Sequence, residues 1–315
     1  MGWFLRRVLQ GVVMLWVVIT LVFLSINFVP GDPVELLLSN SGGTPDPTMV
    51  ALLREDLGLN LPVWQQYLFK MEQLAHMDLG RSLVDETPVA REILRRLPRT
   101  LELIGAAGLL SLLLGLPAGI VAALRPIGLF SRLANAMAGT AQSVPVFVIG
   151  SLMVLIFAQY LGWLPAGGYV AFDRDPGRHL ILLLMPAATI AVGLSAVVFR
   201  ITRASMLDVM PLDYVRTARA KGVPARQVTL RHVLRNALMP VITIVALQLG
   251  GLLAGTVLVE SVFNWPGLSG MLVVGVSARD YPVVTGVILV VSACYIALNV
   301  LVDIIYGLVD PRVRK

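Results

Sequence analysis

The chain has 315 residues, of which 57% are apolar, 14% charged and 7% aromatic, and its formal net charge is +6. Because an ordinary soluble domain is about 25% charged, this composition excludes a typical soluble protein. The high apolar content also excludes a disordered tail, and the single cysteine excludes a disulfide scaffold. The remaining class is an integral membrane protein.

The first segment without charged side chains covers residues 8–28 and follows Arg6 and Arg7. Its apolar run is longer than the core of a typical signal peptide, and the residues after it lack a small-residue cleavage site. We therefore predict a retained first transmembrane helix within residues 1–29.

Residues 30–99 are expected to form an extracytoplasmic cap. Residues 39–47 are rich in turn-forming residues, and Thr48 suits the N-cap of a short helix that ends at Gly58. Apolar residues then recur at helical spacing over 64–75 and again over 89–97, before Pro98. The cap either packs on the membrane part of the chain or forms a docking surface for an extracytoplasmic partner, and neither reading excludes the other.

Residues 100–315 contain the remaining apolar segments, each long enough to cross a bilayer as a helix. They cover about 101–124, 133–161, 180–200, 237–260 and 282–304. Backbone amides in lipid must be hydrogen-bonded within the segment, so these segments are predicted to be helices. Together with the first segment they predict an all-α integral membrane protein with six transmembrane helices. Pro145 in the third segment predicts a kink, a tilt or a broken helix.

The charged residues divide unevenly between the two predicted sides of the membrane. One side receives both termini and the loops 125–132 and 200–235, and it carries a formal charge of +12. The other side receives residues 30–99, 162–179 and 260–280, and it carries −4. By the positive-inside tendency, both termini are predicted to be cytoplasmic.

The cytoplasmic loop 205–236 is predicted to contain a short helix that lies across the membrane face. Pro211 suits a helix start, residues 212–221 contain no breaker, and Gly222 with Pro224 ends the helix. A second helical run, 226–239, leads into the fifth span. Positive charge that sets topology and attracts anionic lipid would alone account for the arginines. Because the basic patch lies against the membrane, nucleic acid is not an expected partner.

The sequence predicts neither a nucleotide site nor a metal site. None of the three lysines follows a glycine, which excludes a Walker A motif, and the histidines and the cysteine lack metal-ligand spacing. Residues 267–270 have the G-x-S-G form of rhomboid-class intramembrane serine proteases. That chemistry needs a base, normally a histidine in a later span, whereas the last histidine here is His232. A hydrolase using Ser269 is therefore a remote alternative.

Polar side chains inside membrane spans are candidates for a transport pathway. The candidates here are Asn135, Gln142 and Gln248. They suit a passage for solvated polar solutes, and equally they suit interhelical hydrogen bonds. The span cores contain no ionisable side chain, which disfavours an ion-coupled carrier.

Several sequence strings together resemble the B-type permease subunit of bacterial dipeptide and oligopeptide ABC importers, over essentially the whole chain. This family also includes nickel and glutathione permeases. The strings that carry the resemblance are 30–33 (PGDP), 78–83 (DLGRSL), 96–103 (RLPRTLEL), 203–207 (RASML), 213–222 (DYVRTARAKG), 262–268 (VFNWPGL), 279–282 (RDYP) and 310–312 (DPR).

The resemblance implies a type I ABC importer permease fold with six transmembrane helices, a cytoplasmic coupling helix and an extracytoplasmic helical insert after the first helix. It implies that loop 205–236 carries the EAA motif, whose short helix sits in a groove of the ATPase. Aligned on Gly222, only Ala218 and Gly222 match the general motif, and Pro240 follows five residues later than usual. The coupling residues that it implies are Asp213, Tyr214, Arg216, Thr217, Ala218, Lys221 and Gly222. It also suggests a binding-protein contact or outer gate at Phe263, Asn264, Trp265, Pro266 and Gly267.

The resemblance further implies a division of labour within a complex in the bacterial cytoplasmic membrane. This chain would form the path with a homologous second permease, two cytoplasmic ATPases would bind ATP and Mg²⁺, and an extracytoplasmic protein would deliver the solute. The expected solutes are short peptides, and nickel, glutathione or another small solute is the alternative. The chain itself would be neither an enzyme nor a cofactor-binding protein.

Overall fold

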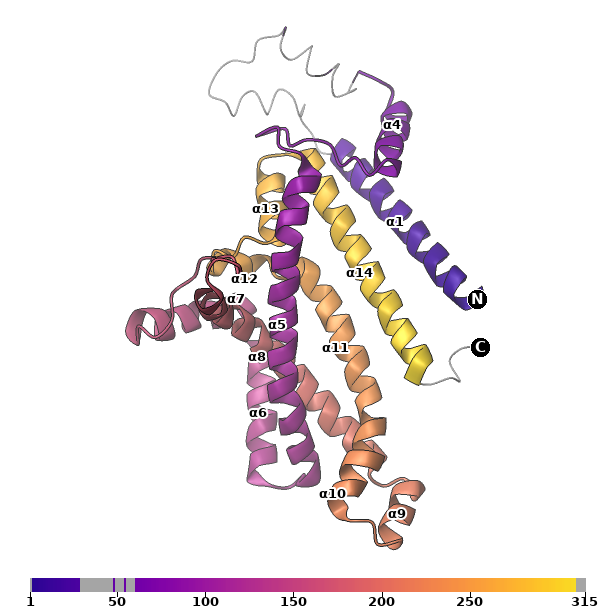
Figure 1. Cartoon of the computed structure of the whole chain (residues 1–315), viewed down its shortest axis with the longest axis vertical. Helices are drawn as coiled ribbons and strands as arrows, with labels where there is room; N and C mark the ends of the chain where they lie inside the picture. Colours follow the sequence, from indigo (N-terminus) through magenta and orange to yellow (C-terminus); the bar gives the residue numbers. More distant parts are fainter. Residues whose placement is uncertain (1, 29–47, 49–53, 55–59, 310–315) are drawn as a thin grey trace. The chain divides into compact units, whose positions relative to one another are not determined.

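The computed structural model describes residues 2–28, 48, 54 and 60–309, and these residues are almost entirely helical (Figure 1). They divide into two compact units. The first consists of Met1–Arg99, Gly267–Val300 and Tyr306–Lys315, and the second of Thr100–Pro266 and Leu301–Ile305. The predicted linker 39–47, most of the helix predicted over 48–58, and the strings at 30–33 and 310–312 lie outside the described residues.

Four helices are long and apolar enough to cross a membrane on their own, and a bent helix pair adds a fifth candidate. The first helix, α1 (Gly2–Phe28), has 27 residues, but its apolar part, Leu9–Ser25, is shorter than the length used for those four. The all-helical class is therefore confirmed, while the count of six spans is not reached on length and composition alone.

In the first unit, α1 packs against the amphipathic helix α4 (Val63–Ala75). The helix predicted over 64–75 is therefore confirmed. Tyr67 of α4 joins the two helices. Its hydroxyl lies 2.8 Å from that of Thr20, and its ring packs edge-on against Phe23 at 5.3 Å. Val63, Trp64, Leu68 and Phe69 of α4 are exposed, whereas Met71 and Leu74 are half-buried.

The helix α5 (Val89–Leu124) runs unbroken for 36 residues, through Pro98. The sequence pattern assigned 89–97 to the cap and began the next span at 101, whereas the backbone continues without interruption. Proline removes one hydrogen bond from a helix interior, but the surrounding turns can continue when packing favours them. In the first unit this packing comes from Val89 and Ile93, which are buried against Val283 and Val287.

Two strings of the resemblance meet in the first unit, beside α13 (Leu268–Ser277) and α14 (Tyr281–Val309). The Ser82 hydroxyl donates a hydrogen bond of 2.5 Å to the buried carboxylate of Asp280. Pro282 packs against Gly80, where an added Cβ would lie 3.7 Å from the proline Cβ.

The second unit contains a broken helix at the position of the third predicted span. Helix α6 (Leu129–Ser143) ends before Pro145, and α7 (Val146–Met153) continues as the π-helix η1 (Val154–Tyr160). The two parts are bent by 103°. Val144 takes an extended backbone, with φ −88° and ψ 126°, because the ring of the following proline excludes the helical conformation. The predicted break is confirmed, and the segment is not one straight span.

Helix α8 (Pro176–Val209) is the central helix of the second unit and packs against α6, α7 and α11 (Arg235–Gly255). The Asp175 carboxylate caps its start by accepting a hydrogen bond of 2.9 Å from the backbone N–H of Arg178. Helix α5 approaches α8 closely through small residues, since a Cβ added at Gly115 would lie 2.6 Å from the Ser195 carbonyl oxygen. Such close backbone approach is typical of helix pairs in membranes.

Candidate functional site

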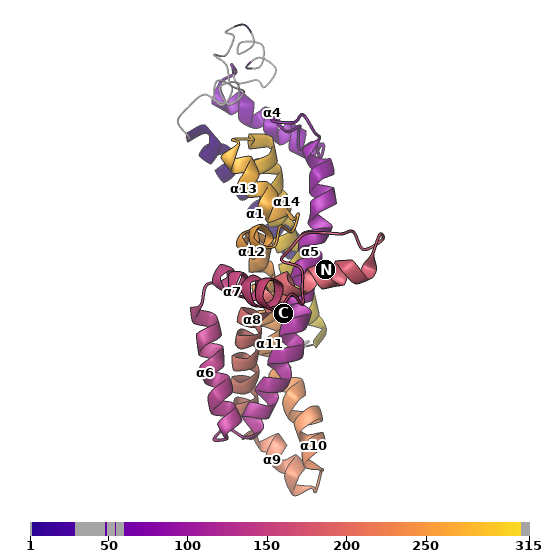
Figure 2. The same cartoon turned by 90° about the vertical axis from the view of Figure 1, so that its left-hand side faces the viewer.

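The first candidate site is the helix α9 (Asp213–Ala220), at the end of the second unit that also holds the turn between α5 and α6 (Figure 2). The sequence predicted a helix over 212–221, and the observed helix differs by one residue at each end. It follows Pro211 and Leu212, and Lys221 is its C-cap. The short α10 (Ala225–Gln227) and the π-helix η2 (Val228–Leu234) then lead into α11.

Gly222 ends α9 in the left-handed conformation, with φ +77°. The Gly222 N–H donates to the Arg219 carbonyl at 3.0 Å, and the Val223 N–H donates to the Ala218 carbonyl at 3.2 Å. This pair of bonds is a Schellman motif, which satisfies the last carbonyls of the helix. Glycine adopts the required backbone without the cost that a Cβ would add.

One face of α9 is buried. Val215 and Ala218 pack with Ala123 at the end of α5, Met206 of α8, and residues of η2 and α11. The opposite face is exposed and charged. Arg216 and Asp213 form an exposed ion pair of 3.9 Å on it. A short helix with one anchored and one charged face suits the transmission of force from a soluble partner.

Hydrogen bonds also attach α9 to the start of α11. The Asn236 side-chain amide donates to the Tyr214 hydroxyl at 2.7 Å and to the His232 carbonyl at 3.2 Å. The Tyr214 hydroxyl lies 3.4 Å from the same carbonyl. Tyr214 therefore points toward the helices of this chain, whereas Asp213 and Arg216 point away from them.

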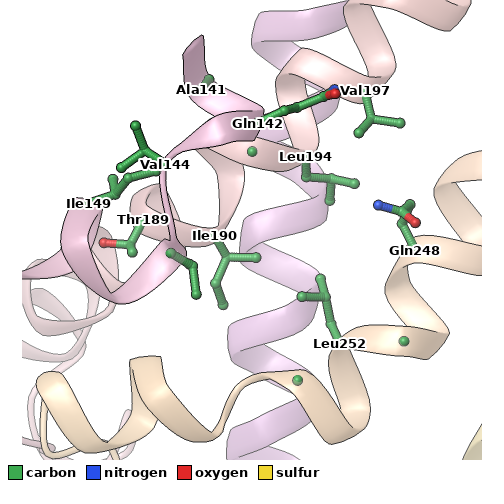
Figure 3. Close-up of a pocket in the computed structure, with 14 residues that line it drawn as sticks. Ala141, Gln142, Val144, Ile149, Thr189, Ile190, Leu194, Val197, Gln248 and Leu252 are labelled. Atoms are coloured by element: carbon green, nitrogen blue, oxygen red, sulfur yellow. The ribbon is translucent and has the colours of Figure 1, made fainter. Parts of the chain in front are cut away.

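The second candidate site is a pocket of about 370 Å³ at the break between α6 and α7, bounded by α8 and α11 (Figure 3). Its walls are mainly aliphatic. The polar side chains that line it are Gln142, Thr189 and Gln248, and the glycines are Gly193, Gly251 and Gly255. A Cβ added at any of the three glycines would have no neighbour within 4 Å, so these positions border open space.

The structure brings two of the three predicted pathway residues together. Gln142 of α6 and Gln248 of α11 line the same pocket (Figure 3). Asn135 does not line it, and its side-chain amide donates back to the Ser131 carbonyl of its own helix at 2.7 Å. The sequence analysis missed Arg200, whose guanidinium donates to the Gln142 side-chain oxygen at 2.7 Å. A single arginine at the predicted end of a span gave no sign of that contact.

The third candidate site, residues 263–267, divides into buried and exposed side chains. Phe263 and Trp265 are at most 2% exposed, whereas Asn264 is exposed and has a positive φ of 49°. The Trp265 ring packs edge-on against Tyr169 at 5.0 Å and against His179 at 5.8 Å. The buried side chains of Phe263 and Trp265 therefore hold the turn in place and are not presented to a partner.

His179 is the centre of a buried polar contact that the sequence did not reveal. Its Nδ1 lies 2.7 Å from the Val170 carbonyl oxygen, and its Nε2 lies 2.6 Å from Oε1 of Glu102. A carbonyl oxygen can only accept, so Nδ1 is the donor in the contact with Val170. The contact with Glu102 links the start of α8 to α5.

Glu260 is a buried carboxylate that the sequence analysis placed in the loop 260–280. It lies in α12 (Val257–Val262), is 1% exposed and accepts hydrogen bonds of 3.0 Å from both Thr100 and Thr256. Ser269, the remote catalytic candidate, lies buried in the first turn of α13. Among the described residues, no group of three or more His, Cys, Asp or Glu side chains could hold a metal ion.

Comparison with known proteins identifies the family of this chain. The family model of the binding-protein-dependent transport system inner membrane component matches residues 115–315, and that of its N-terminal part matches residues 1–104. The chain belongs to this family. It is thus an inner-membrane permease of a bacterial ABC importer of the peptide and nickel family, a transport component and not itself an enzyme. Such permeases work with ATPase and binding-protein partners.

Curated relatives match the whole chain. It is 40% identical over 314 residues to the glutathione transport system permease protein GsiC of Escherichia coli K12, covering 100% of this chain and 99% of that one. The protein of the same name from Pectobacterium atrosepticum has the same identity and coverage.

Solved structures agree on the fold. An amino acid ABC transporter crystallised with histidines matches 71% of this chain and 94% of its own, with a TM-score of 0.51 and 18% identity. The methionine transporter MetNI in inward-facing conformations matches 72% and 97%, with a TM-score of 0.51 and 19% identity. The ABC importer permease fold is therefore confirmed.

Proposed function

We propose that this chain forms one side of the translocation path of an importer for short peptides, with glutathione, itself a short peptide, included in the solute class. The observation that carries this proposal is the pocket at the α6–α7 break, whose polar lining is two amides and a hydroxyl among aliphatic walls. Amides both donate and accept hydrogen bonds, which suits the backbone groups of a peptide. The 40% identity to glutathione permeases supports the same solute class.

The second part of the proposal is that α9 docks with a cytoplasmic ATPase. Its buried face packs on α5, α8 and η2, so a push on α9 is passed to α8 and α11. Both of these helices line the pocket. In this proposal two ATPase subunits bind ATP and Mg²⁺, a second permease completes the path, and both termini of this chain are cytoplasmic.

The third part concerns the extracytoplasmic side. Because Phe263 and Trp265 are buried, we assign them to holding the turn, and we assign contact with the solute-binding protein to Asn264 and Pro266. Gly267 follows as the N-cap of α13 and orients that helix.

Nickel import is the second candidate function within the same family. Nickel prefers imidazole and other nitrogen or sulfur ligands. The polar groups that line the pocket are the amides of Gln142 and Gln248 and the hydroxyl of Thr189. This lining favours a peptide over a bare metal ion.

Purification of the native complex through a tag on this chain tests the assignment. We expect to recover a second permease, ATPase subunits and a solute-binding protein, and to find a short peptide in the binding protein by mass spectrometry. Recovery without an ATPase would contradict the proposal, and so would a binding protein that retains only nickel.

A further inference from the structure

The strongest unexplained feature of the pocket is the arginine beside it. Arg200 lies on the exposed side of α8, and its guanidinium donates to the Gln142 side chain across to α6 at 2.7 Å. Gln142 lines the pocket, and Val197, one helical turn before Arg200, lines it too (Figure 3). The positive charge is therefore held at the pocket's edge by a neutral partner.

The direction of this side chain is unusual for an arginine in a membrane helix. A Cβ at Gly119 of α5 would contact Phe199 and Thr202, so Arg200 lies level with Gly119, about 7.5 Å along the helix from the end of α5. Gln142 lies thirteen residues beyond the start of α6, or about 20 Å from the same loop. Arginines near helix ends normally extend toward the membrane surface. The Arg200 side chain instead extends away from the α5–α6 loop, toward the middle of the membrane.

An inward-directed charge next to a transport pocket is by default a functional group. The amide of Gln142 holds the guanidinium through one neutral hydrogen bond, leaving four of its five N–H groups for other acceptors. A guanidinium binds carboxylates with paired, charge-assisted hydrogen bonds, which are stronger than a bond to an amide. A carboxylate in the pocket could therefore replace Gln142 as the partner of Arg200.

We propose that Arg200 receives the free carboxylate of the transported solute, with Gln142 holding the guanidinium in place until the solute arrives. This inference rests on the function proposed above and names the chemical class within it, a peptide with a free carboxylate. A lipid phosphate has similar chemistry, but at about 20 Å from the α5–α6 loop Gln142 lies beyond the headgroup layer of a bilayer whose apolar core is about 30 Å thick.

The test uses the whole complex in proteoliposomes, with ATP inside and the solute-binding protein outside. The probes are a labelled dipeptide with a free C-terminal carboxylate and the same dipeptide as its C-terminal amide. The binding protein is identical in every sample, so a change in the ratio of the two uptake rates arises in this chain. Co-purification of the partner subunits checks assembly of each variant.

We expect Arg200→Gln to lower uptake of the carboxylate peptide roughly tenfold, the worth of one charge-assisted hydrogen bond, and to change uptake of the amide by less than about twofold. Arg200→Lys should give an intermediate loss. The matched control is Arg178→Gln, which removes an exposed arginine from the first turn of the same helix, far from the pocket.

Gln142→Glu separates solute binding from a structural role. The new carboxylate stays within reach of Arg200 and would occupy it, so we expect a loss of carboxylate-peptide uptake similar to that of Arg200→Gln. If Arg200 only clamps α6 to α8, Gln142→Glu would strengthen the clamp and uptake would match the wild type, which would overturn the inference.

Each remaining outcome of the uptake experiment also tells whether the role of Arg200 or the peptide assignment is wrong. An unchanged ratio in Arg200→Gln would overturn the inference while leaving the peptide importer intact. An equal loss of both peptides that varies with the anionic lipid content would assign Arg200 to a headgroup. Uptake of neither peptide by the wild-type complex would overturn the peptide assignment itself.

Discussion

At the scale of single residues, Gly222 is the position where the backbone most clearly requires one residue type. Its φ of +77° lies in the left-handed region, and it completes the hydrogen bonds that end α9. The space around it is open, because an added Cβ would have no neighbour within 4 Å. A substitution there is therefore costly through backbone strain and not through collision.

This predicts a graded effect of residue type. Gly222→Asn should retain most ATP-driven transport, whereas Gly222→Val, which destabilises the left-handed backbone by about 1–2 kcal/mol, should lower it severalfold. Membrane insertion should be unchanged in both. Gly139→Val, at a helical glycine of α6 with equally open surroundings, is the control for side-chain volume. Equal transport by the two Gly222 variants would show that the end of α9 does not matter for coupling.

Asp85, which lies outside the membrane spans, makes the stability of the turn 82–87 depend on pH. Its carboxylate accepts hydrogen bonds from the Thr87 hydroxyl at 2.7 Å and from the Thr87 N–H at 3.1 Å, and the Thr87 side chain is the main reason that the pKa of Asp85 is lowered. A carboxyl with a lowered folded-state pKa contributes stability above its unfolded value of about 3.9, and this is lost as pH falls through the folded pKa.

We therefore expect the turn 82–87 to stay protected from hydrogen exchange at neutral pH and to lose protection below about pH 4, after correction for intrinsic rates. The effect should be small because Asp85 is exposed. Asp85→Asn should remove this dependence, while Glu86→Gln should keep it. A turn that opens equally at all pH values would contradict the assignment.

At the scale of helices, the sequence predicted helix ends best where a proline or glycine marks them. Pro211, Gly222 and Pro224 bound α9 to within one residue, and Pro145 marked the break between α6 and α7, because proline and glycine act through their own backbone. Pro98 was misleading, since tertiary packing carried α5 through it. The π-helical turns η1 and η2 have no comparable local sign.

The candidate site was predictable only in part, for a related physical reason. The amides Gln142 and Gln248 stood out because polar groups are rare in spans. The contacts of Arg200 with Gln142 and of His179 with Glu102 join residues 58 and 77 positions apart. Such pairs depend on how helices pack, which periodicity does not specify.

The glycines of the pocket give an element-scale test of the path. A side chain at Gly251 would enter open space between α8 and α11 without striking the backbone. Gly251→Leu should therefore leave assembly intact and lower solute uptake at least tenfold by filling the pocket. Gly105→Leu is the matched control, because that glycine also has free space but does not line the pocket. Full uptake by Gly251→Leu would show that the solute does not pass there.

At the scale of the whole molecule, charge sorting and packing agree. The basic loops 125–132 and 200–235 were assigned to one side by charge alone, and in the structure Ala123, just before the first loop, packs on Val215 and Ala218 of α9. The positive charge of these two loops thus gathers around the helix proposed to meet the ATPase.

Membrane orientation can be measured with single cysteines after Cys294→Ala removes the native one. Ile127 and Phe172 are both exposed, in loops predicted to lie on opposite sides. We expect a membrane-impermeant maleimide to label Phe172→Cys in intact cells and Ile127→Cys only after permeabilisation. Labelling of both from the same side would contradict the predicted topology.

The most direct measurement of the central claim is ATP-driven uptake of a labelled short peptide by the reconstituted complex, compared between the wild-type chain and Ala218→Glu. This change places a charge on the buried face of α9, where Ala218 packs on Val215 and Met206. We predict uptake by the wild type, and its loss with uncoupled or absent ATPase binding in the variant. Normal uptake by Ala218→Glu would contradict coupling through α9.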